Sequence, residues 1–269
     1  MGLGAHELLE RDAARMRARA WRDGAHATVC DVIEPWAHGT VVRATRYRHY
    51  FDFNVVRVED EPGMSVEALE SFAEEALAGL AHRRIDFDCV RAGEERRAAF
   101  TARGWRTTRL LWMRHSRPSG MSGDPRVEVV PYEAVQQLRD RWHGDFGDAT
   151  PEYNDQAREV GLMRGVQTLA VCDGGKPVAF AQLERFGMAA EITQVYVEPE
   201  HRGAGLGTAI TLGAIERASV ASDLWICADD EERAKELYAR LGFEPVWRTM
   251  IFLLRPEEKP RREESGAAG

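Results

Sequence analysis

The stretch that decides the fold of this chain is V-Y-V-E-P-E-H-R-G-A-G-L-G-T-A-I, residues 195–210. Its β-branched start predicts a strand that ends before the proline, and an apolar pattern with helical spacing follows the glycines. Backbone amides around Gly203, Gly205 and Gly207 can point at one anion, and the following helix adds its partial positive charge. The stretch therefore predicts a pyrophosphate cradle, with Arg202 as an added cation. The alternative is a turn that only lets strand and helix pack closely.

Composition narrows the class of protein. A chain of 269 residues is long enough for two domains, and its net charge of −8 argues against a general nucleic-acid binder. No apolar run approaches the ~20 residues of a membrane span. The four cysteines have no C-x-x-C spacing, which favours free thiols in a reducing cytoplasm over disulfides or a metal site. We therefore expect a cytoplasmic protein with no metal.

The two halves of the chain resemble each other at a fixed offset. V-R-V-E at 56–59 matches V-Y-V-E at 195–198, an offset of 139 residues. The strands around Cys89 and Cys227 match at an offset of 138 residues, and so do the glycines that end the next two helices. Such agreement predicts a duplicated α/β domain.

Local signals predict most of the elements. Apolar spacing indicates helices over 5–21 and 66–80, the second capped by Ser65. Two glycines at 174–175 indicate a hairpin between two strands. We expect an irregular segment, H-G-D-F-G-D-A-T-P-E-Y, over 143–153.

Two motifs in the second half resemble one family. R-G-A-G-L-G fits the [QR]-x-x-G-x-[GA] signature of GCN5-related N-acetyltransferases, and E-E-R-A-K-E-L-Y-A-R-L-G-F resembles their second motif, at the expected distance and in the expected order. The resemblance covers roughly residues 126–255, and a weaker copy without the motifs covers about 29–115. It implies an α/β fold with two tandem domains, each a mixed, mostly antiparallel sheet flanked by helices. The domains expected are a degenerate one over 1–117, a linker over 118–126, a catalytic one over 127–256 and a disordered tail over 257–269.

The resemblance also implies acetyl-CoA as the cosubstrate. In this family the strand before the loop diverges from the next strand, and pantetheine lies in the gap between them. Main-chain groups around Val195, Tyr196 and Val197 would hold it there. The residues expected to hold the pyrophosphate are Arg202, Gly203, Ala204, Gly205, Leu206, Gly207 and Thr208.

Two side chains are candidates for proton transfer. Tyr238 matches the family's common proton donor to the leaving thiolate, and the alternative is a core tyrosine. Glu191 lies where some members carry a general base, and the alternative is an exposed glutamate at a strand end. Glu231 stands where the family usually has asparagine, which puts that residue's role in doubt.

The acceptor is expected near the segment after the first helix of the second domain. Trp142, Asp145, Phe146 and Tyr153 would supply aromatic walls and a carboxylate for a cationic amine, although each could be an ordinary loop or core residue. The partner expected is a small-molecule amine, with a homodimer left open and neither nucleic acid nor membrane as a partner. Alternatives are a protein or peptide amine as acceptor, or a noncatalytic acyl-CoA-binding or interaction module.

The first half lacks both chemical groups. Where the glycine loop should map it reads G-M-S-V-E-A, and Phe100 stands in place of Tyr238. We therefore expect a degenerate copy that does not bind coenzyme A in the usual way and that stabilises the catalytic half or lines its acceptor site.

Overall fold

The computed structural model describes residues 5–118, 120–145 and 150–255 of the chain. The expected tail and the candidate Phe146 lie outside the described residues. The first half contains α1 (Ala5–Val29), β1 (Val32–Trp36), β2 (Gly39–Arg43), η1 (Phe51–Phe53), β3 (Asn54–Val58), α2 (Val66–Ala76), β4 (Arg83–Phe87), α3 (Val90–Ala102) and β5 (Arg106–His115). The second half contains β6 (Val127–Val130), η2 (Tyr132–Val135), α4 (Gln136–Asp145), α5 (Pro151–Met163), β7 (Gln167–Asp173), β8 (Lys176–Phe186), β9 (Ala189–Val197), η3 (Pro199–His201), α6 (Leu206–Arg217), β10 (Asp223–Asp229), α7 (Ala234–Arg240) and β11 (Phe243–Leu254).

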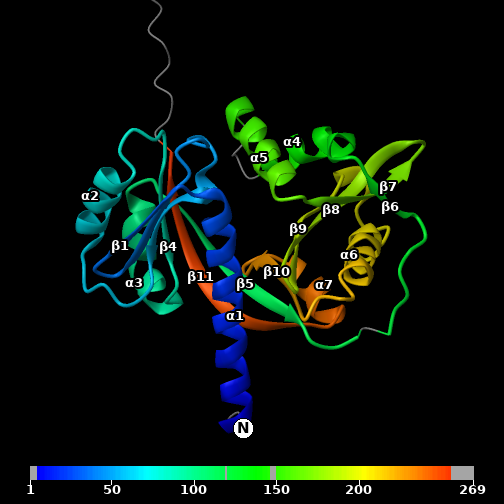
Figure 1. Ribbon diagram of the computed structural model, residues 1–269, viewed down its shortest axis with the longest axis horizontal. Helices are drawn as coiled ribbons and strands as arrows, with labels where there is room; N and C mark the ends of the chain where they lie inside the picture. Colours follow the sequence, from blue (N-terminus) through cyan, green and yellow to red (C-terminus); the bar gives the residue numbers. More distant parts are fainter. Residues whose placement is uncertain (1–4, 119, 146–149, 256–269) are drawn as a thin grey trace, which may run out of the picture.

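The strands form one continuous sheet through both halves (Figure 1). Its order is β1-β2-β3-β4-β11-β5-β10-β9-β8-β7-β6, with only β3–β4 and β9–β10 parallel. The predicted mixed, mostly antiparallel sheet flanked by helices is therefore confirmed. The order also shows that each half gives its last strand to the other, because β11 lies between β4 and β5, and β5 lies between β11 and β10. The predicted domain boundaries remain a prediction, since the sheet itself has no break.

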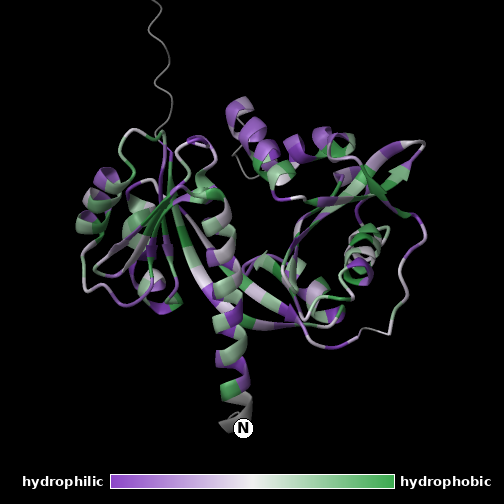
Figure 2. Ribbon diagram, in the orientation of Figure 1, coloured by the Kyte–Doolittle hydropathy of each residue, from purple (hydrophilic) through white to green (hydrophobic). Residues whose placement is uncertain are grey.

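Each half has its own hydrophobic core on one face of the sheet. In the first half, α2 and α3 pack on β3 and β4, and Met250 and Phe252 of β11 complete that core. In the second half, α6 and α7 pack on β7 to β11, with Ile210 and Phe243 buried. Figure 2 shows largely hydrophobic strands beneath these helices, and mostly hydrophilic residues along α5. Both cores therefore depend on strands from both halves.

Helix α1 lies between the two halves and crosses β11 (Figure 1). Ala18 and Trp21 are buried with Trp112, Trp225 and Trp247 in a cluster that we call the tryptophan cluster. Its members come from α1, β5, β10 and β11. In the described part of the chain, no helix is both long and apolar enough to cross a bilayer.

The local sequence predicted a helix cap and a hairpin turn correctly but missed one helix. Ser65 caps α2 by accepting a hydrogen bond from the Ala68 amide, and both hairpin glycines have positive φ, 54° and 80° at Gly174 and Gly175. The segment predicted as irregular runs into a helix, α5, which begins at Pro151 after the cap residue Thr150. Threonine followed by proline is a common helix start, so this helix had a readable signal.

Candidate active site

Strands β9 and β10 run side by side at first and then part. In the described part of the chain their pairing joins Ala189–Ile192 to Asp223–Ile226 and ends there. Strand β9 continues to Val197, and β10 stays paired with β5 as far as Asp229. A gap therefore opens between two central strands at the place that the family resemblance implies.

The backbone of β9 is irregular where the gap opens. The register with β8 shifts between Phe180 and Gln182, and Gln194 has a φ of 51°, a region that residues other than glycine rarely adopt. The Arg139 side chain, which is almost fully buried, donates from Nε to Gln194 Oε1 at 3.1 Å. The register shift and the positive φ mark a β-bulge at the place where β9 and β10 part, and bulges bend the strand that contains them.

Main-chain groups of Val195 and Val197 line this gap. Tyr196 between them pairs with Phe180 of β8, and strand alternation turns the groups of its two neighbours toward the opposite side. Arg202 donates from Nε to the Val197 carbonyl at 3.0 Å, and its guanidinium lies 5.7 Å from the centroid of the Tyr196 ring. Arg202 therefore lies at the mouth of the gap, beside the predicted pyrophosphate position.

The glycine loop has the backbone conformation that its residues allow. Gly203 and Gly205, on either side of the exposed Ala204, have φ values of 81° and 77°, where other residues are strained by roughly 1–2 kcal/mol. The first α6 hydrogen bond described runs from the Ala209 amide to the Gly205 carbonyl. The amides of residues 206–208, Leu206 to Thr208, therefore stand at the open end of the helix. Pyrophosphate fits this set of donors and the positive end of α6.

Tyr238 lies on α7, on the same face of the sheet as α6. Its ring is 6% exposed and packs 6.3 Å from the centroid of Phe243. The neighbouring Leu237 approaches Gly207, where an added Cβ would lie 3.4 Å from its Cδ2 atom. Burial raises the pKa of the Tyr238 phenol, so the hydroxyl is protonated at neutral pH. The phenol is therefore available as a donor, although its catalytic role stays a prediction.

Glu191 lies on the face of β9 opposite to Tyr238 and α6, one residue before the pairing between β9 and β10 ends. Its Oε2 atom accepts a hydrogen bond from Trp21 Nε1 at 2.6 Å. Burial, and secondarily the nearby Glu184 carboxylate, raise the pKa of Glu191 to about 7. A carboxyl group with this pKa can accept a proton from an amine near neutral pH, which favours the base over an ordinary exposed glutamate.

Glu184 and Arg164 adjoin Glu191 and were not predicted. Glu184 pairs with Glu191 across β8 and β9, and its Oε2 atom lies 2.5 Å from an Arg164 guanidinium nitrogen. A cavity of about 40 Å³ beside them is also lined by Trp21 and Phe186. Alternation along β8 could have indicated Glu184, because it follows Phe180 and Gln182 on the face opposite the main core.

The candidate acceptor residues end up in different surroundings. Trp142 packs against the cluster that includes Tyr196, whereas Asp145 is the last residue of α4 and its side chain lies outside the described part. Tyr153 is buried at 4% exposure, stacks on Phe51 at 4.6 Å and donates a hydrogen bond to Asp52 at 3.1 Å. The structure therefore places Tyr153 between the halves, and the acceptor role of all four residues stays a prediction.

Glu231, at the position where the sequence departs from the family pattern, contacts the other half. Both its oxygens accept hydrogen bonds from Arg97 of α3, at 2.5 and 2.7 Å. A bidentate arginine–carboxylate pair suits glutamate better than asparagine. This side chain therefore joins α3 to the loop before α7.

One group of potential metal ligands occurs in the described residues. Ligand atoms of Glu198, Glu200 and His201 lie within 4.8 Å of one another. Glu198 is already paired with Arg141, and Glu200 is exposed. We therefore assign no metal to these three residues, which are close neighbours along the chain.

Comparisons with known proteins agree with this geometry. Residues 132–243 match the acetyltransferase (GNAT) family. A stretch of 86 residues is 37% identical to an uncharacterized N-acetyltransferase of Methanocaldococcus jannaschii, covering 28% of this chain and 38% of that protein.

Two solved structures are similar over most of the chain. One is a conserved protein of unknown function from Staphylococcus epidermidis, with a TM-score of 0.58 and 16% identity, covering 84% of this chain and 94% of that one. The other is a GCN5-related N-acetyltransferase from Kribbella flavida, with a TM-score of 0.54 and 17% identity, covering 88% and 93%. At these identities the likeness concerns the fold.

Proposed function

Because residues 132–243 match the acetyltransferase (GNAT) family, we propose that the second half of this chain transfers an acetyl group from acetyl-CoA to a primary amine of a small molecule. The transfer is by direct attack of the amine in a ternary complex. The observation that carries the proposal is the gap between β9 and β10, which leads to a left-handed glycine loop and the open end of α6.

Different residues around the gap would bind acetyl-CoA and transfer protons. The main chain of Val195 and Val197 would hold the pantetheine arm, and residues 202–208 would bind the pyrophosphate. Acetyl-CoA supplies the activated acyl group. Glu191 would take the proton from the incoming ammonium, directly or through water, and Tyr238 would give one to the departing thiolate.

The acceptor class follows from the charge at the base. Glu191 is partly exposed and lies beside a second carboxylate, Glu184, which suits a cation better than a neutral or acidic group. This pair of carboxylates favours an amine that carries a positive charge before it reacts, and we propose a small molecule over a protein as its carrier.

Two measurements test this function. Calorimetry should show acetyl-CoA binding near micromolar, and thiol release over a panel of small amines and peptides should identify acceptors. Since Glu191 must lose its proton to act and its pKa is about 7, kcat/KM should rise as pH increases through about 7 and then level off. The absence of acetyl-CoA binding would remove the enzyme assignment.

A further inference from the structure

Helix α1 of the first half turns different faces to the two halves of the molecule. Ala18 and Trp21 enter the tryptophan cluster beside β10, whereas Arg19, Arg22 and Asp23 point to the first half. Residues three positions apart on a helix share a face, which explains why Ala18 and Trp21 point the same way. The helix is therefore a physical link between the degenerate half and the proposed active site.

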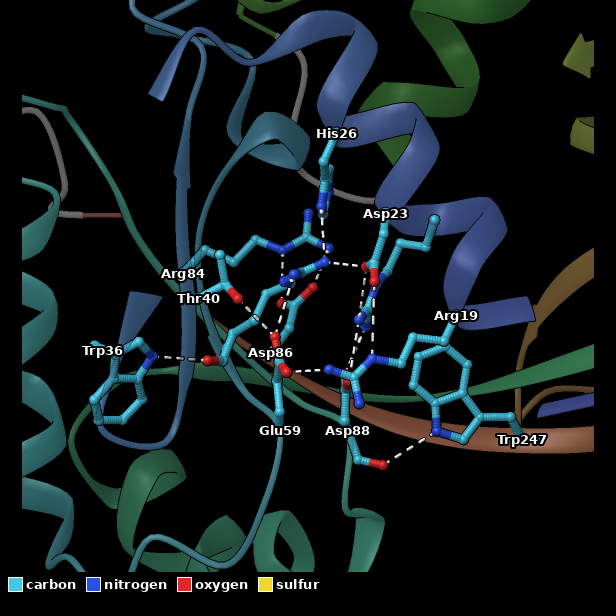
Figure 3. A network of polar contacts seen from close by, with 12 residues as sticks. Arg19, Asp23, His26, Trp36, Thr40, Glu59, Arg84, Asp86, Asp88 and Trp247 are labelled. Carbon is cyan, nitrogen blue, oxygen red and sulfur yellow. Dashed lines mark hydrogen bonds and ion pairs between the residues drawn. The ribbon is translucent and has the colours of Figure 1, made fainter. Parts of the chain in front are cut away.

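The first half holds α1 by a partly buried network of charges (Figure 3). Arg22 donates to both oxygens of Asp88, at 2.5 and 3.0 Å, and the Asp88 side chain is 1% exposed. Asp23, next along the helix, pairs with Arg57 of β3. Trp247 of β11 donates from Nε1 to the Asp88 carbonyl at 3.1 Å. Charge-assisted, bidentate contacts of this kind fix both position and orientation.

Trp21 directly precedes Arg22, so this network fixes the backbone from which its indole projects. The indole ring is 6% exposed, and its Nε1 atom lies 2.6 Å from Glu191 Oε2. An indole N–H can only donate, so the bond favours the carboxylate form of Glu191. The bond engages Oε2, and Oε1 stays available to accept the proton.

We propose that Trp21 is a positioning residue for Glu191, so that the half without a coenzyme site completes the active site of the other half. This inference rests on the proposed function, in which Glu191 is the base. The titratable groups around Glu191 are Glu184 on β8, Arg164 directly after α5 and Cys227 on β10. Trp21 differs from them because it alone comes from the first half of the chain.

The kinetic test is the pH profile of Trp21→Phe. Phenylalanine keeps an aromatic ring in the cluster and removes the N–H donor, so the pKa of Glu191 should rise. We expect the acidic limb of kcat/KM to move up by about one pH unit, which is a tenfold lower value at low pH. Trp105→Phe is the matched control, because it removes a buried indole donor that also bonds a carboxylate, Glu70, but lies in the separate core of the first half. Equal shifts in the two variants, or no shift in Trp21→Phe, would overturn the proposal.

A second measurement does not depend on turnover. In ¹⁵N NMR spectra of the full chain, the Trp21 indole resonance, identified by its loss in Trp21→Phe, should titrate with a midpoint near the pKa of Glu191, about 7. In Glu191→Gln that titration should vanish, whereas the Trp247 indole should be unaffected. If the Trp21 resonance titrates but Glu191→Gln retains full turnover, the contact stands, but the base assignment in the proposed function fails and the positioning role falls with it. A resonance indifferent to Glu191→Gln refutes the contact itself.

Discussion

The two halves of this molecule differ most at the same pair of parallel strands. In the first half, Val56–Val58 pairs with Ile85–Phe87, and the Asp88 amide continues the contact to the Val58 carbonyl at 2.8 Å. In the second half the corresponding strands, β9 and β10, part after Ile192. A closed pair has no room for a pantetheine arm, so this difference favours the proposed coenzyme A site in the second half over one in the first.

The first half also lacks the glycine loop before its helix and the tyrosine that the second half has. At the start of α2, Ser65 satisfies the Ala68 amide and Glu67 adds a negative charge, whereas α6 begins with glycines. Phe100, at the position matching Tyr238, is fully buried 4.4 Å from Phe252. Both halves keep the same fold because strand pairing and helix packing do not depend on the loop amides and the phenol to which the proposed function gives a role.

The largest expected effect concerns whether the halves are independent. Phe252→Ala should cost about 3–5 kcal/mol of unfolding free energy, because this side chain of the last strand fills the core of the first half. Urea unfolding should still show one transition by circular dichroism and by tryptophan fluorescence. Phe186→Ala, at a side chain that is 62% exposed, is the control and should cost under about 0.5 kcal/mol. Separate melting of the halves would contradict the exchange of strands.

The next largest effect compares the two loops. Gly205→Glu places a strained residue and a negative charge at the proposed pyrophosphate site, and we expect acetyl-CoA affinity to fall about 100-fold, near 3 kcal/mol. Gly63→Glu, with φ of 60° in the matching loop, carries the same charge and a similar strain. Calorimetry should find its affinity unchanged. Equal losses in both variants would show that the effect is general and not local.

A smaller effect is expected from exchanging the aromatic residues. Tyr238→Phe should lower kcat about 10- to 100-fold, up to about 2.7 kcal/mol, with little change in the KM for acetyl-CoA. Phe100→Tyr should not make the first half active. It should lower the free energy of unfolding by about 1–3 kcal/mol, because the added hydroxyl enters an apolar core. If Tyr238→Phe leaves kcat unchanged over the pH range, the proton-donor role is wrong.

The smallest expected effect is a change in amide hydrogen exchange in β9, beside the gap. Hydrogen exchange with and without acetyl-CoA should slow at Val195 and Val197 by about tenfold, near 1.4 kcal/mol, as the gap is filled. The Asp88 amide, already bonded to Val58, should exchange at the same rate in both samples. Slowing of both sites alike would indicate global stabilisation and remove the distinction between open and closed pairs.

Most of the candidate site was readable from local sequence because its parts are contiguous. Gly203 and Gly205 adopt positive φ for reasons that lie within the loop itself, and the strand and helix on either side follow from alternating and helical spacing. The repeat offset likewise placed Phe100 and Tyr238 on corresponding helices. Helix α5 was not predicted from the sequence, although Thr150 and Pro151 mark its start.

The sequence by itself predicts the duplicated frame, the glycine loop and a first half without phosphate binding, since each depends on residues close along the chain. Only the tertiary structure decided that β5 and β11 exchange places and that Trp21 meets Glu191, 170 residues away. Neither contact has a local signal, because a strand's partner and a side chain's acceptor are selected by packing across the whole sheet.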